Sequence, residues 1–210
     1  MGYGKILGGD LTKEIFDSLG AEEKKKLVFD LANFLREVHA AVLPEEARKL
    51  GVKDEDAASY SRLVKSVLMG GIGEKTVSDF VDAMVKEYEE MIREKGEMVF
   101  LYNDLHTENM AFDAEAKRLN GVFDFGDVRV EDVCMDFCHL YKFDPGLMKA
   151  VAEKYGELTG RRLSLRRMVM HGRIQELADL AEFIDRPEST VYRNALMRIE
   201  KWSGEMDLFK

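Results

Sequence analysis

Long apolar runs are absent from this chain of 210 residues. Its longest uninterrupted apolar stretches, such as residues 98–102, span only a few positions, whereas a helix that crosses a bilayer needs about 20 apolar residues. The N-terminal segment also lacks the apolar stretch and the small-residue cleavage site of a secretory signal. We therefore expect a cytoplasmic protein with no membrane partner.

Residues that mark disorder or simple repeats are also scarce. The chain has only 3 prolines, while hydrophobic residues make up 46% and charged residues 34% of it. These proportions, without a repeated or low-complexity tract, exclude an intrinsically disordered, collagen-like or simple solenoid protein. The length matches one folded unit, because a domain has about 100–200 residues.

Positive charge is in short supply. The chain has 31 Lys and Arg against 40 Asp and Glu, which gives a net charge of −9 and a pI near 5.1. This balance has the wrong sign for many cationic contacts with a phosphate backbone. We expect no nucleic-acid partner.

Cysteine is rare as well. The only two, Cys134 and Cys138, are four residues apart, a spacing that places both on one face of a helix. Disulfides are uncommon in reducing compartments. A metal site formed with His139 is the alternative, but no second ligand pair follows at a zinc-site spacing. We predict two reduced, buried thiols.

Apolar residues recur at helical spacing over most of the chain. The predicted helices cover residues 11–19, 21–43, 60–69, 77–94, 133–140, 145–158, 165–183 and 189–202. Pro44 is expected to end the second of these helices, and a polar stretch follows at residues 45–58. The glycine cluster at residues 70–73 lacks the preceding strand and the spacing of a phosphate-binding loop, so it predicts a plain turn.

The pattern changes at the centre of the chain. Residues 98–102 are apolar and β-prone, and residues 110–112 and 119–125 flank a turn-like segment at residues 113–117. This predicts a short strand followed by a β-hairpin. The expected fold class is mainly α, of the α+β kind, with a small central β insert.

Polar residues that suit phosphoryl transfer follow the apolar runs of this insert. Asp104 and Asn109 are separated by four residues, and Asp124 begins an Asp-Phe-Gly sequence fifteen positions after Asn109. Phosphoryl transfer needs a carboxylate to receive or orient the acceptor hydroxyl and oxygen ligands to hold Mg²⁺ against the nucleotide phosphates. Each motif alone is weak, because Asp and Asn also favour tight loops. Their order and spacing together match the protein-kinase template.

On these residues the sequence resembles the aminoglycoside phosphotransferase family, which includes choline kinases and other small-molecule kinases of protein-kinase-like fold. The family loop commonly reads His-Gly-Asp-Leu-His-x-x-Asn, and residues 102–109 read Tyr-Asn-Asp-Leu-His-Thr-Glu-Asn. The family metal motif Ile-Asp-Phe-Gly-Asp is matched by Phe-Asp-Phe-Gly-Asp at residues 123–127. Residues 6–12, 34–39 and 131–137 also resemble family segments, so the likeness covers nearly the whole chain.

The resemblance implies that Asp104 is the catalytic aspartate and that Asn109 and Asp124 are the Mg²⁺ ligands. It implies a supporting role for Asp127. His106 matches a common loop position, with a structural or phosphate-adjacent role, and is grouped with the cofactor-binding residues. The implied cofactors are Mg²⁺ and ATP, with GTP as the alternative nucleotide.

Two departures from the family pattern stand out. Tyr102 replaces the usual His, which is expected to weaken the hydrogen bonding within the loop while leaving Asp104 in place. The family also has a mostly β lobe that covers the nucleotide and supplies a phosphate-binding lysine, and Lys5 is not in such a context. Residues 1–10 are therefore expected to be a hinge-like remnant of the lobe junction, and residues 11–210 a single helical C-terminal lobe of the protein-kinase-like fold.

Two functions remain open. The first is an ATP- and Mg²⁺-dependent phosphotransferase that acts on a hydroxyl of a small molecule and is incomplete or weakly active alone; the three motif residues favour it. The second is a noncatalytic lobe that binds a ligand or partner, which the missing lysine-bearing lobe favours. An open docking face would suit a homodimer or a separate chain that supplies the missing lobe.

The acceptor is suggested only by charge. Glu176, Asp179 and Glu182 lie at helical spacing and would offer an acidic face to a polyamine-like acceptor such as an aminoglycoside. The alternative is a solvated helix face, because charged residues are mostly exposed.

Overall fold

The computed structural model describes residues 6–54, 56–68 and 75–204, which belong to two compact units. The first unit is formed by residues 1–55 and 97–168, and the second by residues 56–96 and 169–210. Helices dominate the described residues, which confirms the predicted class. None of the described helices is long and apolar enough to cross a membrane. The predicted turn at residues 70–73 lies outside the described residues.

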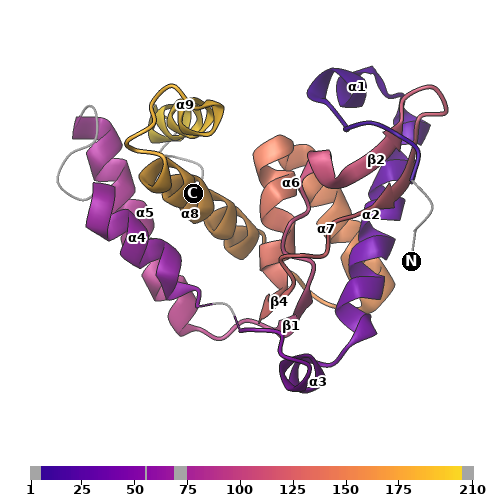
Figure 1. The fold of residues 1–210 in the computed structure, drawn as a ribbon, viewed down its shortest axis with the longest axis horizontal. Helices are drawn as coiled ribbons and strands as arrows, with labels where there is room; N and C mark the ends of the chain where they lie inside the picture. Colours follow the sequence, from indigo (N-terminus) through magenta and orange to yellow (C-terminus); the bar gives the residue numbers. More distant parts are fainter. Residues whose placement is uncertain (1–5, 55, 69–74, 205–210) are drawn as a thin grey trace. The chain divides into compact units, whose positions relative to one another are not determined.

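The first unit combines helices with two small antiparallel sheets (Figure 1). Its strands are β1 (Met98–Leu101), β2 (Met110–Asp113), β3 (Arg118–Val122) and β4 (Arg129–Asp132). Its helices are α1 (Lys13–Ser18), α2 (Ala21–Ala41), α3 (Pro44–Lys49), α6 (Cys138–Phe143), α7 (Pro145–Thr159) and the start of α8 (Leu165–Glu182). Two short 3-10 helices, η1 (Thr107–Asn109) and η2 (Val133–Phe137), precede β2 and α6. The predicted central β insert is therefore present.

Helix α2 is the long helix of the first unit, and it lies along α7 (Figure 1). Its buried face repeats every three or four residues, and includes Leu27, Leu31, Leu35 and Val38. The helix begins at Gly20, whose N–H donates to the Glu23 carboxylate. The apolar period thus predicted this helix correctly, although it ends at Ala41.

Pro44 was expected to end the second helix, but α2 already ends at Ala41, and Pro44 begins α3. Proline suits the first helical position, because the N–H that it lacks would have no partner inside the helix there. Glu45 and Glu46 lie in the first turn of α3 and Arg48 in the last, as the helix dipole favours. The polar stretch at residues 45–58 was not predicted to contain a helix, so α3 was missed.

The two sheets have different origins in the sequence. Strands β2 and β3 form the predicted hairpin, and its turn is closed by the Asp113 carboxylate, which accepts from the N–H groups of Glu115 and Ala116 at 3.1 and 2.9 Å. Strand β4 pairs with β1 and was not predicted. Its sequence carries the charged residues Glu131 and Asp132, which are nevertheless only 2% and 4% exposed. Burial of these side chains by tertiary contacts overrides their weak strand propensity.

The segment before α1 attaches to the hairpin through its backbone. Gly9 and Phe112 exchange two N–H···O=C bonds, at 2.9 and 2.8 Å. At Gly8, φ is +143°, and a Cβ there would lie 2.7 Å from the Ala111 carbonyl carbon. Only glycine fits this approach. The hinge-like role of residues 1–10 stays a prediction.

The elements of the second unit are all helices among its described residues. It contains α4 (Ala58–Leu68), α5 (Lys75–Arg93), the remainder of α8, and α9 (Thr190–Gly204). Arg173 of α8 is 3% exposed, and its guanidinium carbon lies 5.4 Å from the Trp202 ring and 5.9 Å from the Phe80 ring. Aromatic faces stabilise a cation in such a setting.

One buried carboxylate, that of Asp136 in η2, anchors the chain that leaves β1. Its oxygens accept from the N–H of Tyr102 at 2.9 Å, the N–H of Asn103 at 2.5 Å and Nε2 of His39 at 2.8 Å. Asp136 is 0% exposed. A buried charge is stable only where several donors satisfy it, as they do here.

The anchor continues through a buried chain of polar groups. The Tyr155 hydroxyl lies 2.9 Å from Nδ1 of His39 and accepts from Arg161 at 2.5 Å. Because Arg161 has no acceptor to offer, the hydroxyl donates its own proton to His39, which leaves Nε2–H to donate to Asp136. Arg161 in turn pairs with Glu97 at 2.8 Å, directly before β1. The network therefore joins both ends of β1, since Asp136 binds the residues after this strand and Arg161 pairs with the residue before it.

We expect Asp136→Asn to lower the free energy of unfolding by about 3 kcal/mol, because an amide N–H₂ would face backbone and imidazole donors. Urea denaturation followed by circular dichroism measures the change. The control is Glu157→Gln, an exposed carboxylate of α7 that pairs with Lys154, for which little change is expected. Equal stability of the two variants would show that Asp136 does not anchor the loop.

Both cysteines are free thiols and both are buried, as predicted. Burial, assisted by the charge of Asp132, raises the pKa of the Cys134 thiol to about 12. The nucleophilic thiolate is therefore scarce at neutral pH. We expect a disulfide reagent such as DTNB to label both thiols only after unfolding. Rapid labelling of the native chain at neutral pH would contradict this.

Candidate active site

The loop after β1 holds three of the predicted site residues, Asp104, His106 and Asn109. The loop starts at Tyr102 and Asn103, whose backbone N–H groups donate to the Asp136 carboxylate. Asn103 then adopts φ +66°, a left-handed conformation that Asn tolerates better than most residues. Asp104 follows directly, with a side chain that is 26% exposed. A buried anchor and a tight turn together hold this carboxylate at the surface of the first unit.

Asp104 contacts both other residues of the loop. Its Oδ2 accepts from Nδ2 of Asn109 at 2.7 Å, and its Oδ1 lies 3.3 Å from Nε2 of His106. Nδ2 of Asn109 also donates to the Asp104 carbonyl at 3.0 Å. The four-residue spacing of Asp104 and Asn109 thus places an amide donor against the carboxylate and leaves the amide oxygen of Asn109 as its remaining ligand atom.

The electrostatics of Asp104 reflect its position between solvent and core. Burial raises the pKa of its carboxyl above the ordinary value, and the charges of Asp127 and Asp124 act in the same direction. His106 and the Asn109 hydrogen bond favour the ionised form and oppose this rise. A carboxyl with a raised pKa is a better proton acceptor when ionised.

The hairpin explains why Asn109 and Asp124 lie near each other although fourteen residues separate them. Met110 of β2 pairs with Val122 of β3, so Asn109 and Phe123 lie directly beyond one end of the hairpin. The Phe123 N–H donates to the Asn109 carbonyl at 3.0 Å. Asp124 is the next residue, exposed and with φ +66°. Strand pairing therefore brings the two predicted oxygen ligands to one place.

Tyr102 links the two motifs. Its ring packs edge-on against Phe125 of the Asp-Phe-Gly sequence, with centroids 5.0 Å apart, and against Phe34 of α2 at 5.3 Å. Its hydroxyl donates to the Phe123 carbonyl. We expected this replacement of His to weaken the hydrogen bonding of the loop, but Tyr102 supplies a hydrogen bond of its own between the loop and the hairpin.

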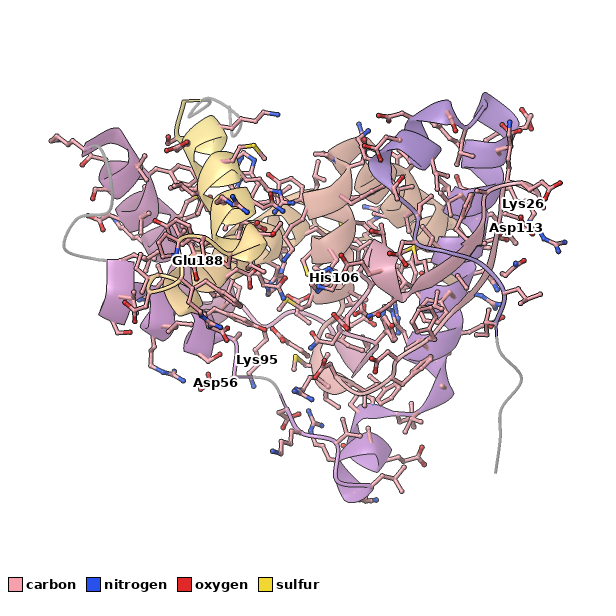
Figure 2. The ribbon with its side chains drawn as sticks, turned by 45° about the horizontal axis from the view of Figure 1, so that its top comes forward. Lys26, Asp56, Lys95, His106, Asp113 and Glu188 are labelled. Carbon is pink, nitrogen blue, oxygen red and sulfur yellow. The ribbon has the colours of Figure 1, made fainter. Side chains whose placement is uncertain are left out.

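His106 lies beside α6 (Figure 2). Its ring faces that of His139, with centroids 3.8 Å apart and planes tilted by 48°. His139 is buried, and burial lowers its pKa well below the usual value, with the charges of Lys142 and His106 acting the same way and a backbone hydrogen bond with Asn103 opposing them. From the sequence, His139 was considered only together with the cysteines. Its place beside His106 was missed because α6 contacts the loop through tertiary packing, which local patterns do not show.

The remaining predicted residues lie in different settings. Asp127 is exposed and pairs with Arg129 at 3.7 Å, and its charge raises the pKa of the Asp104 carboxyl. In the second unit, Glu176 is only 2% exposed and pairs with Arg198, whereas Glu182 is exposed. Asp179 is half-buried. These three carboxylates are therefore unequal in exposure and do not form a uniformly solvated face.

Solved structures show which fold this arrangement shares. The GDP complex of aminoglycoside 2'-phosphotransferase-IIIa superposes with a TM-score of 0.81 at 17% identity, over 97% of this chain and 70% of that one. The streptomycin–ATP complex of APH(2")-IIa gives a TM-score of 0.64 at 20% identity, over 95% and 68%. Macrolide 2'-phosphotransferase type I gives 0.63 at 15% identity, over 86% and 61%.

These likenesses confirm the protein-kinase-like fold expected from the sequence. Identities this low show the fold alone, whereas a match to a family model shows membership of a family. Such a model matches residues 3–168, which include the loop after β1, the hairpin and the Asp-Phe-Gly sequence. The chain belongs to the phosphotransferase enzyme family, known as APH.

Proposed function

We propose that this chain is a phosphotransferase-type domain that transfers a phosphoryl group from Mg²⁺-bound ATP or GTP to a hydroxyl of a small molecule. The observation that carries the proposal is the placement of the half-buried Asp104 carboxylate beside Asn109, at the hairpin end from which Asp124 projects. A carboxylate next to two oxygen ligands is the inventory that phosphoryl transfer needs.

Asp104 has the part of orienting the acceptor hydroxyl and receiving its proton. The Asn109 amide fixes one carboxylate oxygen at 2.7 Å and His106 lies near the other at 3.3 Å. Both contacts limit rotation of the carboxylate, so that it is held ready for the hydroxyl. Its raised pKa, caused first by burial, strengthens it as a proton acceptor.

Asn109 and Asp124 are the residues that would hold Mg²⁺. The donor set fits this ion, because Mg²⁺ prefers carboxylate and amide oxygens. Oδ1 of Asp124 accepts from the Gly126 N–H at 3.2 Å, which orients the carboxylate and leaves Oδ2 for an ion. When bound, Mg²⁺ neutralises charge on the nucleotide phosphates during transfer. Asp127 supports this group from the same segment.

The acceptor and the rate belong to the proposal too. The solved structure of APH(2")-IIa is a ternary complex with streptomycin and ATP, and a cationic acceptor suits a chain with net charge −9. We propose weak turnover by these 210 residues alone, because positioning supplies most of the acceleration of phosphoryl transfer and the sequence offers no lysine in a phosphate-binding context. A second chain or second copy that supplies such a cation would raise it.

Metal-nucleotide binding tests the ligand assignment. We expect Mg·ATP or Mg·GTP to bind in a calorimetric titration, and Asp124→Asn to weaken this binding at least about tenfold, because a charged ligand is lost. The control Asp127→Asn removes a charge from the same segment and should have a smaller effect. No binding by the native chain up to millimolar nucleotide would favour the noncatalytic alternative.

Turnover tests the role of Asp104. In a preparation that shows turnover, alone or complemented by a second chain, we expect Asp104→Asn to reduce kcat by about 10²–10⁴-fold, because proton acceptance is lost. The affinity for Mg·ATP should stay nearly unchanged. Glu108→Gln is the matched control, since Glu108 is an exposed carboxylate of the same loop, and its kcat should equal that of the native chain. Undiminished turnover by Asp104→Asn would overturn the assignment.

A further inference from the structure

Three side chains meet where the loop after β1 touches α6. One carboxylate oxygen of Asp104 and one imidazole nitrogen each of His106 and His139 lie within 4.8 Å of one another. The residues come from two elements, since Asp104 and His106 belong to the loop and His139 to α6. This ligand set differs from that of the Asn109–Asp124 pair, because it contains two imidazoles.

We propose that Asp104, His106 and His139 form a binding site for a divalent transition-metal ion of the Zn²⁺ type. Two imidazole nitrogens and one carboxylate oxygen are a common three-ligand set for zinc, with the fourth position left for water or a substrate oxygen. Imidazole suits Zn²⁺, Co²⁺ and Ni²⁺, whereas Mg²⁺ prefers oxygen ligands. The site would therefore select a different ion from the one used with the nucleotide.

The buried nitrogen of His139 is an independent observation that points to a ligand. Among the described residues, Nδ1 of His139 is buried and has no hydrogen-bond partner. A buried polar atom in this condition costs free energy, and a bound ion is one of the groups that satisfies it.

One pair of the three ligand atoms already has the spacing of a tetrahedral site. A tetrahedral Zn²⁺ lies about 2.0–2.1 Å from its ligands and holds them about 3.4 Å apart. Oδ1 of Asp104 and Nε2 of His106 are already 3.3 Å apart. His106 is a half-exposed side chain, at 44%, so its ring can rotate toward the ion without disturbing the core. The charges of Asp124 and Asp127 favour a cation here, and that of Lys142 opposes it.

An ion at this site would occupy the carboxylate that we assign to the acceptor hydroxyl. Zn²⁺ would then inhibit phosphotransfer by taking the Asp104 oxygen. This consequence rests on the proposed function, whereas metal binding itself does not. The two are distinguishable, because binding is measured without nucleotide or acceptor.

The test is a titration of the untagged, reduced 210-residue chain with Zn²⁺ by calorimetry and with Co²⁺ by visible absorption. We expect one ion per chain, and a loss of affinity of about tenfold or more in both His106→Gln and His139→Gln. Excess Mg²⁺ should not compete. His171→Gln, a buried histidine of the second unit, and Cys138→Ala serve as controls and should bind as the native chain does.

Circular dichroism shows which variants fold. Because His106 is half-exposed, His106→Gln keeps the test decisive even where His139→Gln does not fold. The proposal is overturned by the absence of saturable Zn²⁺ binding, by undiminished affinity in His106→Gln, or by affinity lost in Cys138→Ala alone. The last result would place the ion on a cysteine instead.

Discussion

The site depends first on the satisfied burial of one charge, the carboxylate of Asp136. Water cannot solvate it, so three N–H donors must, and two of them belong to the backbone that enters the loop. The position of Asp104 is therefore fixed by a requirement that lies in the core. The same hydrogen-bond network continues through His39 of α2 to Tyr155 of α7 and Arg161. The two helices that flank the β insert therefore also help to satisfy the buried charge. A buried polar network of this kind is stable only as a whole.

A second constraint comes from strand pairing. The hairpin places the residues just before β2 and just after β3 at one end, which is why Asn109 and Asp124 are neighbours. Tyr102 then ties this end back to the loop by a hydrogen bond and by ring contact with Phe125. Loop and hairpin are thus held by two different kinds of interaction, one polar and one aromatic. Displacement of either segment would break both.

Local patterns predicted most of the helices and the hairpin, because these depend on periodicity and on short spacings. The roles assigned to the site residues stay predictions. The strand β4 escaped prediction because Glu131 and Asp132 are buried by contacts distant in sequence. The helix α3 escaped it because Pro44 was expected to end a helix, whereas it begins one. His139 was considered only for an alternative metal site with the cysteines, and only the packing of α6 against the loop shows that it faces His106. Long-range contacts account for the misses of β4 and His139, and a local property of proline accounts for that of α3.

The left-handed backbone at two positions has a consequence for how the site tolerates sequence change. Asn103 and Asp124 both have φ +66°, a region where residues other than Gly, Asn and Asp incur about 1–2 kcal/mol of strain. The common family loop has Gly at the position of Asn103, which the same backbone accommodates. At Asp124 the permitted residues are fewer still if this side chain holds the proposed Mg²⁺, since it must then suit both the backbone and the ion. The backbone conformation alone therefore restricts which residues can replace Asp124. An alanine at this position would combine two effects, backbone strain and loss of the carboxylate.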